Sequence, residues 1–536
     1  MIGRLFTLML FGVFVYTVDA WGQKHRGKTY GGSKSDRSMS MTETMLNGLV
    51  LTGGTDSDDI DFANMNKGQD DMFIIALDSK GEIIHKNTFG GSDSEFGYSI
   101  INTNDGGYIL TGTTFSQDGD FNGMQKGGED IVIIRLNATY DILWKKIIGG
   151  SEYDAVSKVI ETKNGDFVFV GATSSTDGDF NVINPGSYGI VIFKINASGT
   201  LLWHKTIGGS KYENGNTIAQ TRDGGYVITG FTISDDVDFL GMNKGGNDIF
   251  VIKLNMDGNV DWKITVGGSD NDVGVSIVGV EDGYIVSGHS ASNDGDFTGM
   301  KKGPARFTDI CVFKLSLDGT ILWKNMYGGT NDENHSTILV TPQGEYILTG
   351  TTISNDGDFI NMNKGYEDIY IVKLDANGNI KWKNLLGGSR SDYANASVIL
   401  SEGGYAISGH TYSNDGDFDG SEKGEADIFI MKLDTNGNLN TTTTINEFSE
   451  PTTTLSVHPN PLSYSTTVSY KVNTPSNVRI ELLNTLGQTI EVLREDYSDI
   501  GTYQLPLNVS TISSGMYSVR MRSGSMNEVV PVWVVR

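Results

Sequence analysis

The sequence of 536 residues is poor in cysteine, in proline and in positive charge. Its single cysteine, Cys311, excludes an intramolecular disulfide, a cysteine-based zinc site and an iron–sulfur cluster. Only 9 prolines accompany 69 glycines, and this ratio favours many tight turns. There are 40 lysines and arginines against 66 aspartates and glutamates, which gives a net charge of −26. Such a chain repels phosphate groups, so we do not expect it to bind nucleic acid.

Recognisable catalytic patterns are also missing. The 7 histidines are scattered, and no pair has the spacing of a zinc-binding helix. No Gly-x-Ser-x-Gly segment suggests a serine nucleophile. Cys311 lies in a continuous apolar segment, so we expect an inert, buried thiol. The sequence therefore gives no positive evidence for an enzyme and predicts no catalytic residue.

Long hydrophobic runs are confined to the N-terminus. Residues 1–20 combine Arg4 with an apolar run from Leu5 to Val18, and small residues allow cleavage after residue 20 or residue 22. This pattern predicts a secretory signal peptide. The alternative, a membrane anchor, is disfavoured because the run is shorter than the ~20 residues of a membrane-spanning helix. We therefore expect a mature protein without a membrane span, secreted or held at the outer cell surface.

A repeat fills most of the chain. Gly-Gly followed by Ser or Thr recurs seven times at spacings of 59, 59, 59, 59, 61 and 59 residues, beginning at Gly31, Gly90, Gly149, Gly208, Gly267, Gly328 and Gly387. Each repeat contains four apolar segments with the alternation or β-branched composition of strands, separated by turn residues. Four strands in about 59 residues is typical of a propeller blade.

The ends of the repeat predict how the ring closes. The first copy begins with only a fourth-strand segment (HRGKTYGG), and the last copy ends after its third strand at Leu433. The N-terminal strand can therefore complete the seventh blade and remove an exposed edge. We predict an all-β protein: a seven-bladed β-propeller at 21–440, a Thr-rich linker at 441–452 and a small β-sandwich at 453–536.

The long connections of each blade carry acidic residues. Strands alternate in direction, so the connection between strands two and three and the crossover between blades should share one face. The first of these contains Asp-x-Asp-Phe in every blade. The two aspartates are Asp59 and Asp61, Asp118 and Asp120, Asp177 and Asp179, Asp236 and Asp238, Asp294 and Asp296, Asp356 and Asp358, and Asp415 and Asp417.

These aspartates allow two interpretations. Paired carboxylates and loop carbonyls are ligands that Ca²⁺ prefers, so the loops are possible calcium sites, and no other cofactor is indicated. In the alternative, the aspartates bond nearby backbone N–H groups and a recurrent lysine neutralises them without metal. That lysine is present in six blades, as Lys67, Lys126, Lys244, Lys302, Lys364 and Lys423.

Blades three and five break the repeat. Blade three has Pro185 and Gly189 in place of the lysine and of the aspartate that opens the third strand, and blade five has three additional residues after Lys302. Loops that differ between blades are candidate ligand contacts, and Tyr188, Arg306 and Phe307 are the side chains we select there. Neutral drift of tolerant loops is the alternative explanation.

The last eighty residues differ in composition from the repeats. Segment 455–536 resembles the type A C-terminal sorting domain of proteins exported by the type IX secretion system of Bacteroidota. The similarity rests on Pro459-Asn460-Pro461, on the stretch from Leu482 through Gly487 to Gln488, and on Ser513-Ser514-Gly515-Met516-Tyr517. The resemblance implies that the type IX machinery is a partner and that the protein crosses the outer membrane. The propeller itself resembles uncharacterised bacterial repeats of the DGGY type.

Three functions fit the sequence. We favour a secreted or cell-surface binding or adhesion module whose acidic loop face engages a glycan, a protein or a cation. The alternatives are an extracellular polysaccharide hydrolase or lyase, since propellers also carry such enzymes, and a structural scaffold of the surface or matrix. Seven nearly equivalent blades favour binding or scaffolding over catalysis, because catalysis requires one selected set of residues.

Overall fold

A computed structural model describes two compact units, which divide between residues 441 and 442. In the first unit it describes residues 27–44, 46–180, 187–304, 306–418 and 423–439. In the second it describes residues 455–458, 465–472, 475–484, 489–499, 501–513, 515–523 and 526–534. The expected signal peptide (1–20) and linker (441–452) lie outside the described residues.

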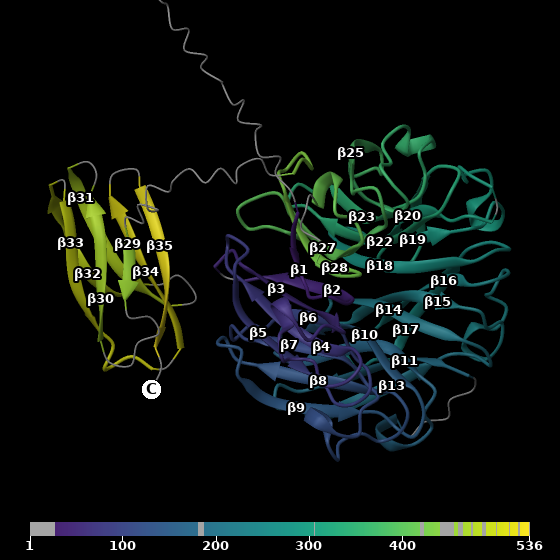
Figure 1. Cartoon of the computed structure of the whole chain (residues 1–536), viewed down its shortest axis with the longest axis horizontal. Coiled ribbons are helices and arrows are strands. Elements are labelled where there is room, and N and C mark those ends of the chain that lie inside the picture. Colours follow the sequence, from purple (N-terminus) through teal and green to yellow (C-terminus); the bar gives the residue numbers. More distant parts are fainter. Residues whose placement is uncertain are drawn as a thin grey trace, which may run out of the picture. The chain divides into compact units, whose positions relative to one another are not determined.

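The first unit is a ring of seven antiparallel four-stranded sheets (Figure 1). The first strand of each blade lines the central channel. These innermost strands are β2 (Asp36–Glu43), β6 (Glu95–Asn102), β10 (Asp154–Glu161), β14 (Glu213–Gln220), β18 (Asp272–Val280), β22 (Glu333–Val340) and β26 (Asp392–Ile399).

The second and third strands of each blade are almost completely buried, as their β-branched and aromatic composition predicts. The second strands are β3 (Leu49–Thr55), β7 (Tyr108–Thr114), β11 (Phe167–Thr173), β15 (Tyr226–Thr232), β19 (Gly283–Ser290), β23 (Tyr346–Thr352) and β27 (Tyr405–Thr411). The third strands are β4 (Asp71–Leu77), β8 (Asp130–Leu136), β12 (Gly189–Ile195), β16 (Asp248–Leu254), β20 (Asp309–Ser316), β24 (Asp368–Leu374) and β28 (Asp427–Leu433).

The outermost strand closes the ring as the sequence predicts. In six blades it is the fourth strand of the repeat: β5 (Ile83–Phe89), β9 (Ile142–Ile148), β13 (Leu201–Ile207), β17 (Val260–Val266), β21 (Ile321–Tyr327) and β25 (Ile380–Leu386). In the seventh it is β1 (Lys28–Tyr30), which pairs with β28 so that Lys28 lies opposite Ile430. The N-terminal strand therefore completes the last blade, and the predicted seven-bladed propeller is confirmed.

The hydrophobic core lies between neighbouring blades. One cluster, for example, combines Ile131 and Ile133 of blade two with Phe169 and Phe193 of blade three. The phenylalanine of every Asp-x-Asp-Phe segment is fully buried at the end of a short 3₁₀ turn. These turns are Ile60–Phe62, Gly119–Phe121, Gly178–Phe180, Val237–Phe239, Gly295–Phe297, Gly357–Phe359 and Gly416–Phe418. Among the described residues, no helix has the length and apolarity needed to cross a membrane.

The second unit is the predicted β-sandwich. One sheet has the order β29 (Leu455–His458), β30 (Ser465–Val472) and β33 (Gly501–Asn508). The other has the order β32 (Thr489–Ser498), β31 (Ser476–Leu483), β34 (Gly515–Ser523) and β35 (Met526–Val534). Val468 and Leu507 of the first sheet share one buried core with Ile480 and Val519 of the second.

Candidate functional site

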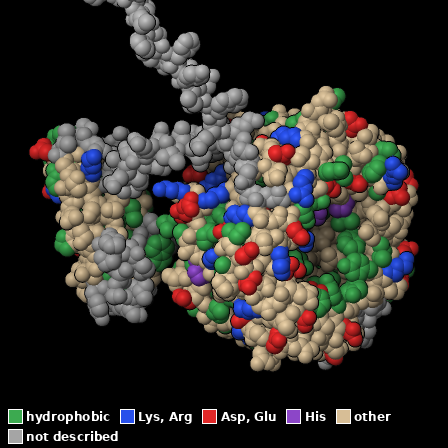
Figure 2. Space-filling model, viewed as in Figure 1, with side chains coloured by type: hydrophobic (Ala, Val, Ile, Leu, Met, Phe, Trp, Pro, Cys, Tyr) green, Lys and Arg blue, Asp and Glu red, His purple; other side chains and the backbone are tan. Residues whose placement is uncertain are grey.

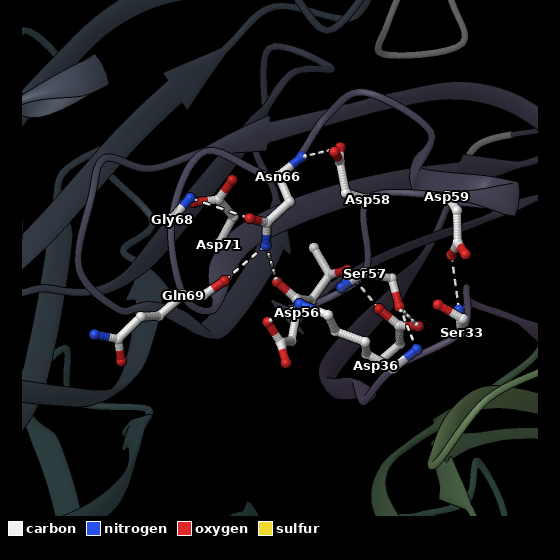
Figure 3. Close-up of polar contacts among 12 residues, drawn as sticks. Ser33, Asp36, Asp56, Ser57, Asp58, Asp59, Asn66, Gly68, Gln69 and Asp71 are labelled. Carbon is white, nitrogen blue, oxygen red and sulfur yellow. Dashed lines mark hydrogen bonds and ion pairs between the residues drawn. The ribbon is translucent and has the colours of Figure 1, made fainter.

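The two long connections of each blade meet on one face of the propeller, as the strand parity predicts. We call this the long-loop face. In blade one the Ser33 N–H, in the crossover from blade seven, donates to Asp59 Oδ1 at 2.7 Å. The Gly31 N–H donates to Asp61 Oδ2 at 3.0 Å. Figure 3 shows the first of these contacts and, in the same view, the side chains of Asp36 and Asp71.

The same two bonds recur in all seven blades. The first aspartate of the motif accepts the N–H of the Ser or Thr after Gly-Gly at 2.7–2.8 Å. The second accepts the N–H of the first glycine at 2.9–3.1 Å. We call this arrangement of crossover and Asp-x-Asp-Phe loop the clasp. It uses the motif carboxylates to join each blade to the one before it.

The recurrent lysines strengthen the clasp from the preceding blade. Lys67 Nζ lies 2.7 Å from Asp120, and Lys244 Nζ lies 2.6 Å from Asp296. The same ion pair joins Lys126 to Asp179, Lys364 to Asp417 and Lys423 to Asp61. In blade five Lys301 takes a different role, with its buried ammonium 3.7 Å from Asp309.

These contacts support the interpretation in which the acids are neutralised without metal. Within the described ranges, no group of three or more His, Cys, Asp or Glu side chains is placed to hold a metal ion. Calcium binding by the fourteen motif aspartates stays a prediction that only a measurement with the ion can test. The chemistry that the clasp performs in the structure is hydrogen bonding between loops.

Beneath six of the seven clasps lies a second pair of carboxyl groups; the exception joins blades three and four, where Gly189 replaces one of the acids. The aspartate that opens a third strand faces the Asp or Glu that opens the next innermost strand, as Asp71 faces Glu95. Burial raises the pKa of Asp71 and Asp368 to about 7, and that of Asp130, Asp248 and Asp427 to about 6. Each of these five has one oxygen, Oδ1, without a hydrogen-bond partner in the described structure.

The partner acids are buried by the same packing. Asp36 accepts hydrogen bonds from the Thr55 hydroxyl and, at 2.8 Å, from the Ser57 hydroxyl. Burial nevertheless raises the pKa of Asp36 to about 6 and that of Asp392 to about 7. Because these carboxyls are 0% exposed, they are out of reach of a large substrate.

Residues that differ between blades lie at the mouth of the channel on the long-loop face. Three positions recur: the residue before the innermost strand, the residue after the second strand and the residue before the third strand. The first accepts the backbone N–H of the second in every blade, as Tyr153 O accepts from Ser174. It also meets the third position of the preceding blade, as Tyr212 meets Tyr188. We call these positions the channel rim.

The rim carries a cluster of aromatic side chains over blades three and four. The Tyr188 ring lies 5.2 Å from Tyr153 and 5.0 Å from Tyr212, both edge to face. Tyr212 in turn lies 5.4 Å from Phe231. Tyr153 hydrogen-bonds Glu129, whose pKa is raised by burial. Tyr188, selected from the sequence, is therefore the centre of a cluster whose other members the sequence did not reveal.

Arg306 and Phe307 lie apart from this cluster. They belong to blade five, whereas Tyr188 belongs to blade three, and blade four lies between. The Arg306 guanidinium stacks 4.5 Å from the Phe307 ring. The next residue, Thr308, donates its backbone N–H to Asp332 of blade six at 2.8 Å. The structure thus anchors the longer loop to the rim without joining the two sequence-selected groups.

The channel below the rim contains a cavity of about 550 Å³ lined by the innermost strands of all seven blades. Its wall is rich in hydroxyl and amide groups, including Tyr98, Ser157, Asn216, Thr337 and Asn395. Figure 2 shows a hollow in the propeller with histidine and hydrophobic side chains at its wall. A cavity of this size lies within the ~300–1,000 Å³ of small-ligand pockets.

Comparison with known proteins identifies the second unit. Residues 456–535 match the model of the secretion system C-terminal sorting domain. The C-terminal unit is a sorting domain. This confirms the resemblance seen in the sequence, and the domain implies the secretion machinery as a partner and export to the cell surface or beyond. Gly515 opens β34 of the sorting domain, whereas Pro459, Asn460, Pro461 and Gly487 lie outside the described residues.

A curated protein and several solved structures are similar to this chain at low sequence identity. Regulatory protein FlaEY of Caulobacter vibrioides is 21% identical over 373 residues, covering 63% of this chain. The chain spans 38% of the length of that curated relative. Among solved structures, the Pan2 WD40 domain of Neurospora crassa has a TM-score of 0.41 at 10% identity, covering 73% of this chain and 88% of its own.

Two further structures have lower scores. PorZ, a surface component of the type-IX secretion system of Porphyromonas gingivalis, has a TM-score of 0.32 at 12% identity and covers 91% of this chain and 64% of its own. A thermostable family-43 glycoside hydrolase has a TM-score of 0.29 at 13% identity, and the match covers 55% of this chain and 93% of the hydrolase. None of these likenesses carries a functional argument for the sorted propeller.

Proposed function

We propose that this sorted propeller is a secreted or surface-held binding module, and that its ligand is an extracellular glycan bound at the channel rim. The observation that supports it is that residues repeated in every blade and residues that differ between blades lie in different places and make different contacts. The repeated aspartates, lysines and phenylalanines are occupied in the clasps and the core, so they hold the ring together. The residues left for recognition are those that differ between blades, and they converge on the rim.

The chemistry of the rim suits a sugar ring. Tyr153, Tyr188 and Tyr212 offer apolar ring surface together with hydroxyl groups, a combination that pairs well with the C–H faces and hydroxyls of a sugar. The buried carboxyl pairs beneath the clasps are equivalent in several blades and inaccessible, which does not favour the hydrolase or lyase alternative.

Binding of a glycan panel to the full chain tests the proposal. We expect Tyr188→Ser and Tyr212→Ser each to weaken binding by about tenfold or more, because central aromatic residues carry most of the energy of a binding site. Tyr366→Ser is the matched control, since Tyr366 is 69% exposed on the same face but belongs to a clasp loop. Equal losses in all three variants would refute the rim as the site, and no binding across the panel would refute the function.

A further inference from the structure

Blade five differs from the other blades in the loop before its third strand. The residue preceding the recurrent lysine is Lys301 in this blade, whereas blades one, two, four and six have Asn66, Gln125, Asn243 and Asn363. The Asn243 amide donates to Thr232 O at 3.2 Å and to Gly246 O at 3.0 Å. The Lys301 ammonium takes over this role, since it donates to Ser290 O at 3.3 Å and to Phe307 O. Blade five therefore has an amine where other blades have a neutral amide.

This amine lies in the protein interior next to a carboxyl group. Lys301 Nζ is 3.7 Å from Asp309 Oδ2, and both side chains are only 1% exposed. Taking two charges out of water is costly, and their attraction repays the cost only when the contact is close and the remaining oxygens are hydrogen-bonded. Asp309 Oδ1 has no hydrogen-bond partner in the described structure. As a permanent ion pair, Lys301 and Asp309 are therefore poorly compensated.

A third buried group, Glu333, lies beside Asp309. Glu333 Oε2 and Asp309 Oδ1 lie 2.2 and 2.5 Å from the point that a Cβ atom of Gly328 would occupy, so the glycine lets the two carboxyl groups approach each other. Glu333 is 0% exposed, and burial raises its pKa to about 8, so its carboxyl group is protonated at neutral pH. An amine, a carboxyl group and a protonated acid therefore meet where water is excluded.

We propose that Lys301 and Asp309 condense to an intramolecular amide bond, with Glu333 as the group that carries the proton. The bond formed joins Lys301 Nζ to Asp309 Cγ, and the bond broken is that between Cγ and Oδ2. One water molecule leaves, and no oxidant or other reactant is needed. The reaction replaces two buried charges with one neutral amide, which removes the cost of burying them.

Every proton in this reaction has a donor and an acceptor at hand. The Lys301 ammonium first transfers a proton to Asp309 Oδ2, which leaves a neutral amine and a carboxylic acid. The Nζ lone pair then attacks Cγ while Glu333 protonates Oδ1, which takes up the electron pair of the C=O bond. Nζ passes a second proton to the Oδ2 hydroxyl, which leaves as water with the electron pair of the Cγ–Oδ2 bond. Oδ1 returns its proton to Glu333 as the C=O bond re-forms, so Glu333 ends as it began.

The amide closes the extended loop of blade five. This loop carries the stacked Arg306 and Phe307 and is bonded to Asp332 of blade six through Thr308. A covalent link restricts the unfolded chain in the way a disulfide does, and this chain has a single cysteine and forms no disulfide within itself. The inference does not depend on the ligand of the propeller.

Peptide mapping of the full chain with trypsin and mass spectrometry tests the proposal. An acylated Lys301 resists trypsin, so we expect a branched peptide that joins Lys301 to the segment beginning at Phe307, lighter than its two separate parts by one water molecule. Lys301→Asn introduces the residue of blades one, four and six, and we expect it to abolish the branched peptide and to lower the unfolding midpoint. Glu333→Gln keeps the shape of the side chain but is no longer an acid, and we expect at least tenfold less branched peptide.

Lys302→Asn is the matched control. Lys302 is the exposed neighbour of Lys301 in the same loop, so its replacement changes the net charge equally and should leave the link between Lys301 and Asp309 intact. The parent protein decides the main point without any variant, because separate peptides that end at Lys301 and begin at Phe307 would overturn the amide bond. An equal yield of branched peptide in Glu333→Gln would overturn the role of Glu333.

Discussion

Ile60 and Val237 have backbone conformations that normally require glycine. They take the place of the glycine in Gly-Asp-Phe, with φ +49 and +48, and their side chains are 53% and 60% exposed. A left-handed conformation costs an L-residue about 1–2 kcal/mol. We therefore expect Ile60→Gly and Val237→Gly to stabilise the propeller, each by about 1 kcal/mol after the entropy of glycine in the unfolded chain is counted. Thermal and urea unfolding of each variant measure this.

The reverse substitution is the control at this scale. Gly119 has φ +57, and a Cβ atom there would approach the carbonyl oxygen of Gly90 to 2.3 Å. Gly119→Val should therefore lower the unfolding midpoint. If Ile60→Gly lowers the midpoint as well, the exposed side chain contributes packing that outweighs the strain.

At the scale of the element, the contribution of the clasp to the free energy of unfolding can be measured. Asp120→Ala removes the acceptor of the half-buried Gly90 N–H and the partner of Lys67. We expect a loss of about 1–2 kcal/mol, because an unpaired backbone donor costs more than a surface ion pair. Lys67→Met removes the ion pair and the hydrogen bond that Lys67 Nζ donates to the Thr88 carbonyl oxygen at 2.9 Å, but it leaves the Gly90 N–H its acceptor. It should therefore cost less than Asp120→Ala, about 1 kcal/mol. Both variants should lose the same free energy of unfolding in EDTA as in millimolar Ca²⁺. If Ca²⁺ raises the unfolding midpoint of the parent protein but not that of Asp120→Ala, the loop is a calcium site.

The clasp also shows what a sequence can predict. The spacing of the glycine pairs and Asp-x-Asp-Phe segments predicted seven blades, the closure by the N-terminal strand and the shared face of the long loops, because each repeats a local backbone geometry. The sequence did not decide whether Asp59 and Asp61 bind a metal ion or accept hydrogen bonds, because their role depends on the direction of the N–H groups in the crossover. Tyr153, Tyr212 and Phe231 were missed, since they belong to no motif and form a cluster with Tyr188 only when the ring brings unlike blades together. Position-by-position comparison of the blades would have revealed them.

At the scale of the whole molecule, the buried carboxyl pairs make stability depend on pH. In seven of their aspartates burial raises the folded pKa from the ordinary value of 3.8 to about 6–7; these are Asp36, Asp71, Asp130, Asp248, Asp368, Asp392 and Asp427. Between the unfolded and the folded pKa the folded chain binds more protons than the unfolded chain. The contribution of these aspartates to the free energy of unfolding is therefore complete below about pH 4 and is lost as the pH rises through about 6–7. The first aspartates of four clasps, Asp59, Asp236, Asp294 and Asp415, have the opposite effect. Hydrogen bonds from the side chain and backbone of Ser210 lower the pKa of Asp236, and bonds from the backbone and side chain of the equivalent serines lower the pKa of the other three, so their contribution to stability is lost in acid.

The propeller should therefore be most stable near about pH 5, and its unfolding midpoint should fall by about 5 °C or more between pH 5.5 and pH 8. Asp71→Asn keeps an acceptor for the Lys67 N–H, which Asp71 Oδ2 accepts at 2.7 Å, but it cannot ionise. This variant should show a smaller fall than the parent protein and a higher midpoint at pH 8. A parent midpoint that is constant or rises over this interval would mean that the pairs ionise without cost, and that cations or water inside the ring compensate their charge.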